Sequence, residues 1–306
     1  YLQKAEDALK QKGYKVFSYQ VPPGEKSKSL RYFEEIVTAA LQAGLDRKSA
    51  IVALGGGVIG DLAGFAAACY MRGIRFIQVP TTVLAHDSSV GGKVAVNHPL
   101  AKNIIGAFHQ PVMVLYDTST LKTLPPRQIR AGMAEVVKHG LIWDASFVQW
   151  CGENADKLLG LQSSSLEYAL YQGCKVKAEI VSKDERENDL RAILNLGHTI
   201  GHALEAVAQY NELLHGEAIS IGMAGAAYLS EQLGVAEEPI YAETVGLLQK
   251  FGLPVRIPEH FDEDGIMRSM MHDKKFREGK MVFILPVRPG EVTIHREVPA
   301  DKVMET

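Results

Sequence analysis

The sequence predicts an α/β protein made of a Rossmann-like nucleotide-binding domain and a mainly helical metal-binding domain. Short apolar strands alternate with helical stretches up to Asp117, which is typical of a mainly parallel sheet covered by helices. The pair Pro125-Pro126 marks a joint, and helical apolar spacing dominates the rest of the 306 residues. We therefore divide the chain into domains at 1–120 and 121–306.

The composition excludes several classes of protein. Lysine and arginine number 33 against 36 aspartate and glutamate, a net charge of −3 that gives no sign of binding to nucleic acid or a membrane surface. No uncharged apolar run is long enough to span a bilayer, and nothing resembles a signal peptide. Because Cys69, Cys151 and Cys174 lie far apart, we expect a reducing compartment and a cytoplasmic protein.

Elements of the first domain follow from apolar periodicity and from glycine stops. We expect helices at Tyr1–Lys12 and Leu30–Ala43, an apolar helix ending near Met71, and strands at Lys15–Tyr19, Ile51–Leu54, Arg75–Val79 and Val112–Tyr116. The irregular loop at 22–29 follows the first of these strands, where Glu25 and Lys28 suit a ribose or phosphate. Solvated turn charges are the commoner explanation of such residues.

A glycine-rich turn, Gly55–Asp61, joins the second strand to the apolar helix. Bare glycine backbone and the unpaired N–H groups of a new helix suit an anion. The spacing of Gly55, Gly57 and Gly60 fits the dinucleotide fingerprint, but the acidic residue expected after the next strand is absent. The turn therefore favours a phosphate-bearing ligand, with a tight turn that binds nothing as the alternative.

Polar side chains crowd the loop after the strand at Arg75–Val79, where open α/β sheets bind ligands. They are Thr81, Thr82, His86, Asp87, Ser88 and Ser89, followed by Gly91-Gly92-Lys93. We expect the next residues, 94–110, to be mostly loop.

Helices dominate the second domain. They are expected at Arg127–Trp143, Ser146–Leu159, Ser165–Lys183, Leu194–Ala208, Gly216–Leu233 and Ile240–Phe251. The strands Met281–Leu285 and Glu291–Ile294 are spaced as a hairpin around Pro289-Gly290.

Two histidines four residues apart, His198 and His202, share one helical face at a spacing typical of zinc ligands. His215 follows a few residues later, and Glu135 lies with Lys138 and His139 on adjacent turns of another predicted helix. One carboxylate and two histidines with an open position would form a catalytic zinc site. Taken singly, each histidine is more often a hydrogen-bonded core residue.

Several cations lie beside glycine, asparagine or acidic residues rather than on regular polar stripes. They are Lys93, Lys102, Lys138, Lys177, Lys183, Arg191, Lys274 and Lys275. Cations around a metal suggest a polyanionic small substrate, although each alone is more often solvated. The charged run at 183–189 is expected to be an exposed loop at a helix end.

Taken together, these motifs resemble the 3-dehydroquinate synthase family over nearly the whole chain. The matching segments are Gly55–Asp61, Tyr70–Gly73, Val79–Thr82, Asp87–Lys93, Lys102-Asn103, Ala134–Lys138, Asp184–Arg186, Asn195–His198 and His215–Glu217. The resemblance implies an NAD- and zinc-dependent (or cobalt-dependent) enzyme that converts 3-deoxy-D-arabino-heptulosonate 7-phosphate to 3-dehydroquinate and phosphate in the shikimate pathway. It also implies that the family's opening strands of the nucleotide domain are missing before Tyr1.

Site residues follow from the resemblance position by position. Glu135, His198 and His215 would hold the metal, whereas His202 would contact the substrate. Substrate binding and catalysis would further involve Asp87, Lys93, Asn103, Lys138, Lys177, Arg191, Asn195 and Lys275 or Lys274. The NAD site would be lined by Glu25, Lys28, Gly56, Gly57, Val58, Asp61, Thr81, Thr82, Lys102 and Thr123. Arg72 would reach the partner subunit's active site in a homodimer.

Three alternatives remain. Another sugar-phosphate cyclase, such as 2-deoxy-scyllo-inosose synthase or sedoheptulose 7-phosphate cyclase, would share the NAD and metal sites. Its substrate lacks a carboxylate, so Arg191 and the pair Lys274-Lys275 argue against it. A metal-dependent dehydrogenase resembling glycerol dehydrogenase would produce NADH. A non-catalytic protein that binds nucleotide and metal is the third.

Overall fold

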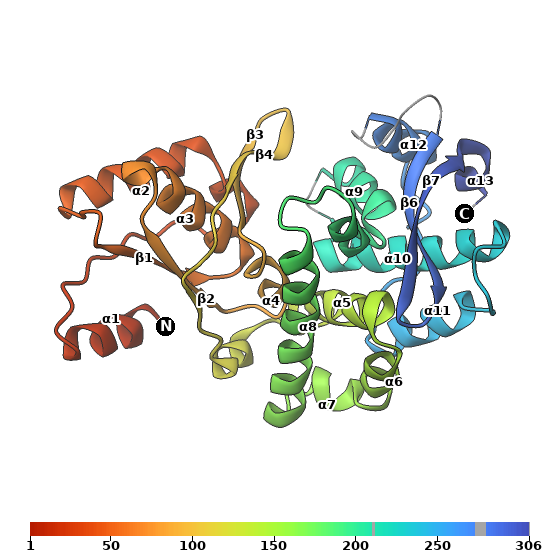
Figure 1. The fold of residues 1–306 in the computed structure, drawn as a ribbon, viewed down its shortest axis with the longest axis horizontal. Helices are drawn as coiled ribbons and strands as arrows, with labels where there is room; N and C mark the ends of the chain where they lie inside the picture. Colours follow the sequence, from red (N-terminus) through yellow and green to blue (C-terminus); the bar gives the residue numbers. More distant parts are fainter. Residues whose placement is uncertain (210–211, 273–279, 306) are drawn as a thin grey trace. The chain divides into compact units, whose positions relative to one another are not determined.

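The computed structural model of the protein describes residues 1–209, 212–272 and 280–305. Two compact units make up the structure, Tyr1–Leu124 and Pro125–Thr306, and Figure 1 labels most of their helices and strands. The second unit opens with α5 (Pro126–Trp143), whose first residue is a proline at a position where a missing N–H costs no helix hydrogen bond. No helix among the described residues is both long and apolar enough to cross a membrane.

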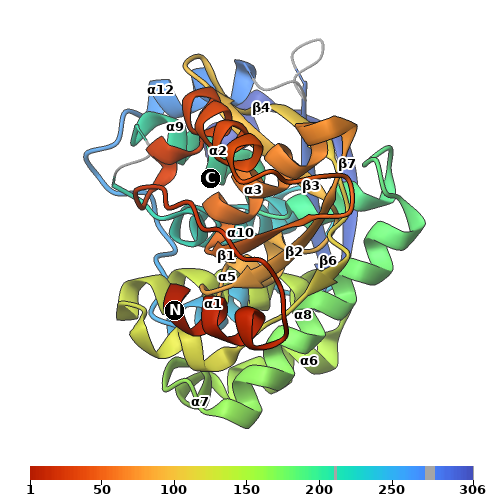
Figure 2. The same cartoon turned by 90° about the vertical axis from the view of Figure 1, so that its left-hand side faces the viewer.

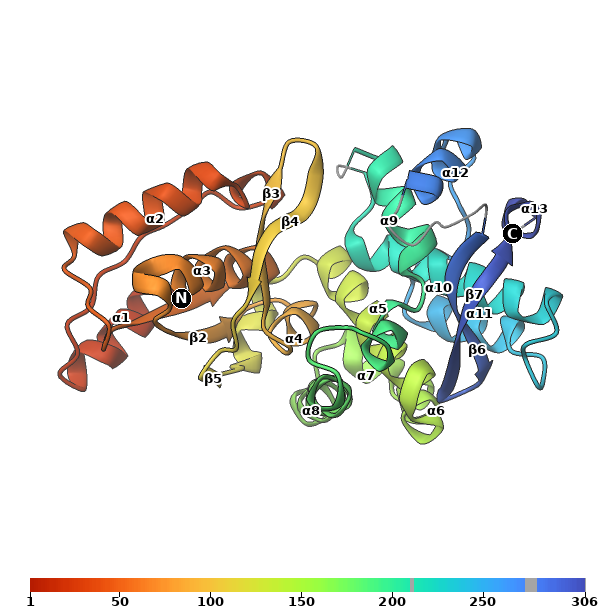
Figure 3. The same cartoon turned by 45° about the horizontal axis from the view of Figure 1, so that its top comes forward.

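The first unit is built on a small parallel sheet, as predicted. Strands β1 (Ala50–Gly55), β2 (Arg75–Pro80) and β5 (Met113–Val114) pair in the order β1-β2-β5. Helix α3 (Gly57–Cys69) packs on β1 and β2, and α2 (Leu30–Gln42) packs on α3, so both helices lie on one face of the sheet (Figures 1 and 3). Apolar side chains of these elements form the core of the unit.

Residues 94–110, which we expected to be mostly loop, form an antiparallel hairpin of β3 (Lys93–His98) and β4 (Ala101–Phe108). The expectation is wrong because polar residues at the tip of the hairpin obscure the alternation of apolar and polar residues in the strands near its base. Val94 and Val96 are buried against α3, where a Cβ on Gly64 would come within 2.5 Å of Val94 Cγ1. Close packing of Val94 on Gly64 therefore stabilises a hairpin in a segment that contains many polar residues.

The strand expected at Lys15–Tyr19 does not form in the structure. Phe17 and Tyr19 are exposed, and β1, seen beside β2 in Figure 2, lies at the edge of the described three-stranded sheet. The segment does not pair with the open edge of β1, so its β propensity alone does not produce a strand.

Short elements complete the first unit. They are α1 (Leu2–Gln11), η1 (Glu25–Ser27), η2 (Tyr70–Arg72), α4 (Ala85–Ser88) and η3 (Thr118–Thr123).

Helices dominate the second unit, as predicted, and α10 (His215–Gln232) is packed on several sides. It contacts α5, α9 (His198–Val207), α11 (Tyr241–Lys250) and β6 (Lys280–Arg288), which pairs with β7 (Glu291–Pro299) in the expected hairpin. The remaining elements are α6 (Ala145–Glu153), α7 (Ala155–Leu159), α8 (Ser163–Lys183), η4 (Leu190–Asn195), α12 (Glu263–His272) and α13 (Ala300–Met304).

Several boundaries in this unit differ from the predictions. The single helix expected at Ser146–Leu159 is divided into α6 and α7, and α12 and α13 were not predicted. Helix α9 begins at His198 rather than Leu194, because Gly197 has a left-handed φ of 79° that a continuous helix does not contain. His198 is thereby placed at the first position of a helix.

Candidate active site

Three potential metal ligands converge in the second unit. Glu135 lies in α5, His198 is the first residue of α9, and His215 is the first residue of α10. Glu135 Oε1 is 3.4 Å from His215 Nε2 and 3.7 Å from His198 Nε2. Metal bonds of about 2.0–2.1 Å in a tetrahedron separate ligand atoms by about 3.3–3.4 Å, so these atoms fit around one zinc-sized ion.

Glycines allow the three helices to approach closely enough to form this group. A Cβ on Gly216 would lie 1.8 Å from the backbone oxygen of Ala131, one turn before Glu135. A Cβ on Gly222 would lie 1.9 Å from the backbone oxygen of Gly197, next to His198. Backbone contact at these two crossings thus brings His198 of α9 and His215 of α10 close to the carboxylate of Glu135 in α5.

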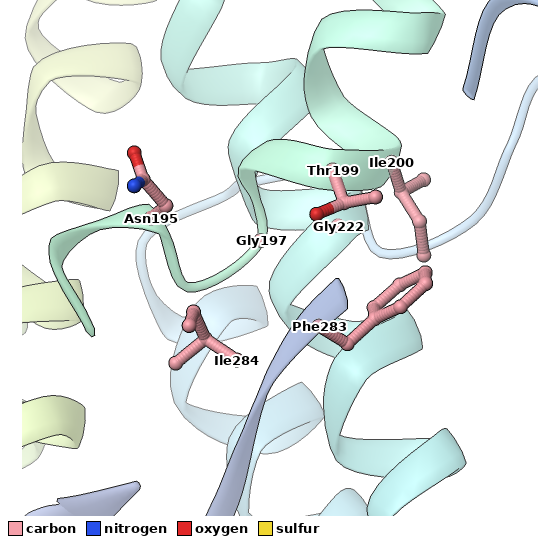
Figure 4. A pocket seen from close by; sticks show the side chains of 7 residues that line it. All are labelled: Asn195, Gly197, Thr199, Ile200, Gly222, Phe283 and Ile284. Atoms are coloured by element: carbon pink, nitrogen blue, oxygen red, sulfur yellow. The ribbon is translucent and has the colours of Figure 1, made fainter. Parts of the chain in front are cut away.

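Figure 4 shows the second crossing, where Gly197 and Gly222 face each other beside Phe283 and Ile284 of β6. The pocket that these residues line has no room for a water molecule, so it is a packing junction. Thr199 closes it by donating a hydrogen bond to Val282 O at 3.3 Å.

The two histidines differ in protonation. Burial lowers the pKa of His198 well below its usual range, and the nearby Lys138 ammonium lowers it further. Burial also lowers the pKa of His215, but Glu135 and Glu205 outweigh that effect and raise it to about 9. His198 is therefore neutral at pH 7, whereas a metal bound at His215 would displace a proton from it.

Buried cations lie in α5 and on two elements that pack against it. Lys138 is 1% exposed and forms an ion pair with Glu135, which is also 1% exposed. Lys177 of α8 and Arg191 of η4 are buried too, on elements that pack against α5. Burying a cation is costly, so several of them in one region indicate a site for anions.

Asp184 organises the loop that presents Arg191. Its carboxylate accepts hydrogen bonds from the backbone N–H groups of Asn188, Asp189 and Arg191 at 2.9–3.0 Å. The Arg191 guanidinium in turn donates to Glu185 O. As expected, much of the charged run at 183–189 is exposed, but it has a defined structure.

Replacing Asp184 by alanine is expected to destabilise the protein at neutral pH and to have less effect in acid. Hydrogen bonds from three backbone N–H groups lower the pKa of this carboxylate to about 2 from 3.8. Since the native pKa is depressed, the carboxylate contributes stability above the unfolded pKa, and this is lost as the pH falls through the native pKa. Urea unfolding of both proteins from about pH 6 to about pH 3 measures the effect; a pH-independent difference contradicts it.

His202 lies near the group formed by Glu135, His198 and His215. The His202 ring centroid is 5.1 Å from that of His198 and 6.0 Å from that of His215. Among the described residues, no set that could hold a metal contains both His198 and His202, so the ligand pair suggested by their spacing does not form. Asn195 donates to Glu187 Oε1 at 2.5 Å, and its amide points away from Phe283 in Figure 4.

The first unit carries the glycine turn at the carboxyl ends of β1 and β2. A Cβ on Gly56 would lie 3.0 Å from Thr82 Cγ2, and Thr81 N donates to Gly55 O at 2.9 Å. The first N–H groups of α3, including those of Gly57 and Val58, follow directly and have no intrahelical acceptor by position. This arrangement suits a phosphate group on close-approaching backbone.

A polar network links the loop at 22–29 to α3 and the hairpin. Lys28 is buried and donates to Asp61 and to Asn103. Asn97 donates to Glu25 Oε1 at 2.7 Å and accepts from the Asn103 N–H at 2.9 Å. Solvated turn charge is therefore the wrong description of Lys28.

The other predicted residues lie at several places in the first unit. Lys93 is exposed at the start of β3, Lys102 is half-buried in β4, and Asp87 lies in α4. Thr123 Oγ1 lies 2.8 Å from Tyr1 Oη, and Arg72 has a left-handed φ of 67°. Lys274 and Lys275 lie outside the described residues.

Sequence reasoning missed Glu205, which lies three residues after His202 in α9 and accepts a hydrogen bond from His215. Its position one turn beyond His202 was the available signal. It also missed Asn97 and the close packing of Gly216, which depend on contacts between distant segments.

The fold and site define a class: two-unit α/β proteins with a nucleotide-type glycine turn and a carboxylate–histidine metal group. Residues 18–131 match the family model described as 3-dehydroquinate synthase N-terminal, and residues 132–276 match the one described as 3-dehydroquinate synthase C-terminal. The chain belongs to the 3-dehydroquinate synthase family. A relative named 3-dehydroquinate synthase, from Desulforamulus reducens, is 48% identical over 97% of this chain and 83% of its own length.

Solved structures agree with this assignment. The 2-epi-5-epi-valiolone synthase of Streptomyces hygroscopicus, with NAD⁺ and Zn²⁺ bound, matches with a TM-score of 0.92 and 26% identity over 100% of this chain and 85% of its own. A 2-deoxy-scyllo-inosose synthase complexed with carbaglucose-6-phosphate, NAD⁺ and Co²⁺ matches with a TM-score of 0.91 and 32% identity, over 99% and 85%. Both are similar to this chain in fold.

Proposed function

We propose that this protein converts 3-deoxy-D-arabino-heptulosonate 7-phosphate to 3-dehydroquinate and phosphate, as a lyase of the shikimate pathway. The observation that carries the proposal is the convergence of Glu135, His198 and His215 beside the buried Lys138, in a chain of this family. A carbon–oxygen bond to phosphate breaks, the neighbouring carbon loses a proton, and the ring closes by an intramolecular aldol step. NAD is used and regenerated, so there is no net redox change.

Glu135, His198 and His215 would hold zinc or cobalt, because their donor atoms fit one ion of that size. When bound, the metal supplies Lewis acidity for the substrate hydroxyls, and NAD supplies a reversible hydride acceptor. The glycine turn would hold the NAD pyrophosphate. Its neighbours would line the rest of the cofactor site: Glu25, Lys28, Gly56, Gly57, Val58, Asp61, Thr81, Thr82, Lys102 and Thr123.

The remaining residues of the second unit would bind and orient the substrate. Arg191 suits the substrate carboxylate, because a planar guanidinium matches a carboxylate in two hydrogen bonds. Lys138 and Lys177 suit the leaving phosphate, whose growing negative charge they would stabilise in a site away from water. His202 and Asn195 suit the substrate hydroxyls as hydrogen-bonding groups.

Roles proposed for the first unit rest on the family resemblance. Lys93, Asn103 and Asp87 would bind the substrate, as would Lys275. Arg72 would act on the partner subunit's site in a homodimer. Light scattering would test for the dimer by measuring its mass. A cytoplasmic location is part of the same proposal, because Cys69, Cys151 and Cys174 lie far apart in the sequence.

A phosphate-release assay on the heptulosonate phosphate tests the function. We expect release that stops without NAD or after chelation, with constant absorbance at the NADH wavelength. Activity that persists through both omissions contradicts the proposal. Net NADH formation would indicate a dehydrogenase instead, and faster release from sedoheptulose 7-phosphate would indicate another cyclase.

A further inference from the structure

We propose that Glu205 is a positioning residue for the metal: it fixes the tautomer and ring orientation of His215 so that Nε2 faces the metal. This inference rests on the metal site of the proposed function. Glu205 lies in α9, is 6% exposed, and its Oε2 is 3.1 Å from His215 Nδ1. His215 comes from α10, so the contact joins two helices.

The two ring nitrogens of His215 face different carboxylates. His202, Glu205 and His215 also form a group that could hold an ion. However, a separation of 3.1 Å with ring N–H facing carboxylate oxygen is a direct hydrogen bond. The other ring nitrogen, Nε2, faces Glu135 Oε1 at 3.4 Å, close to the ligand spacing of a tetrahedral ion. The two nitrogens of His215 therefore have different tasks.

A neutral imidazole has one N–H and one lone pair, and the hydrogen bond decides which nitrogen carries the proton. A carboxylate at Nδ1 keeps the proton there and leaves the Nε2 lone pair for the metal. His198 has a similar arrangement, since its Nδ1 lies 3.1 Å from Leu196 O. The partner of His198 is backbone, whereas that of His215 is a side chain that mutation can remove.

Burial makes the contact strong and costly to lose. Glu205 is shielded from water, so its carboxylate depends on hydrogen bonds within the protein. His215 keeps 30% of its side chain exposed and begins its helix, where packing alone constrains a side chain less. Without Glu205 the ring would lose the acceptor that holds its orientation, and the metal would have to select one of several ring positions.

Metal affinity of Glu205→Ala and Glu205→Gln tests this inference. We expect Co²⁺ binding, measured by competition with a chelator, to weaken about 10- to 100-fold in Glu205→Ala, and less in Glu205→Gln, whose amide oxygen still accepts a hydrogen bond. The visible absorption of bound Co²⁺ should also change, because it reports ligand geometry. If Glu205 only stabilised the fold, its replacement would change neither the Co²⁺ affinity nor the spectrum of the folded protein.

Glu179→Gln is the control for replacing a carboxylate that accepts a ring N–H, although the Glu179 side chain is partly exposed and Glu205 is buried. Glu179 Oε2 accepts a hydrogen bond from the Trp143 ring N–H, also at 3.1 Å, in the same unit. The inference is overturned if the Glu205 variants have the same Co²⁺ affinity and the same visible spectrum as this control. If Glu205→Ala does not fold, Glu205→Gln decides, because a loss beyond the control supports the inference and an equal one overturns it. Wild-type protein that binds no Co²⁺ would overturn the proposed metal site as well.

Discussion

Glu135→Gln is expected to abolish phosphate release and to weaken metal binding by more than about 100-fold. Glu135 is the only carboxylate in the group with His198 and His215, so a neutral amide removes the anionic ligand. The change also removes the ion-pair partner of Lys138, which is buried. Breaking a buried pair costs about 3–5 kcal/mol, so the variant should unfold at lower denaturant concentration.

A second substitution separates the two effects of Glu135→Gln. The double variant Glu135→Gln/Lys138→Met removes both charges, and its stability should recover, because replacing a buried pair by apolar groups is often neutral. Its metal binding should stay lost. Metal content and urea unfolding of the single and double variants provide the measurements. A single variant that keeps one equivalent of metal would show that Glu135 is not a ligand.

Gly216→Ala is expected to have the second largest effect. The new Cβ would lie 1.8 Å from the backbone oxygen of Ala131, so α5 and α10 must move apart. Overpacking a core typically costs about 1–3 kcal/mol, and this backbone clash should reach the upper end of that range or exceed it. Because Glu135 and His215 lie beside the crossing, metal affinity should fall together with stability.

Gly246→Ala is the control for that substitution. Gly246 lies within α11, and nothing approaches its Cβ position within 4 Å. Alanine there should raise stability by about 0.5–1 kcal/mol, because it favours the helix more than glycine does. Thermal unfolding and metal titration compare the two variants. Equal melting temperatures for Gly216→Ala and the wild type would rule out the close helix crossing.

Ligand identity shows the limits of local patterns. Spacing alone favoured His198 and His202 as a pair, since residues four apart share a helix face. In the structure Gly197 starts α9 at His198, and the crossings at Gly216 and Gly222 bring in His215. The family resemblance had already indicated His215 rather than His202. Spacing along the sequence, however, does not show where two helices cross.

Secondary structure shows the same limit. The parallel sheet and the principal helices were predictable, because apolar periodicity and glycine or proline stops are local. The hairpin at 93–108 was missed, since its strands depend on the contact of Val94 with α3. The expected strand at Lys15–Tyr19 does not form for the converse reason, because local propensity alone does not bring a segment into pairing with a neighbouring strand.

The sequence by itself determined the α/β class, the glycine turn and the set of residues able to bind metal and anions, because these depend on residue type and short-range spacing. The tertiary structure supplied the contacts that bring Glu135, His198 and His215 together, and the hydrogen bond between His215 and Glu205. Those outcomes depend on where backbones of distant segments touch. Glycines permit that contact because they have no side chain to hold two backbones apart. No local sequence pattern shows which backbone segment will pack against a given glycine.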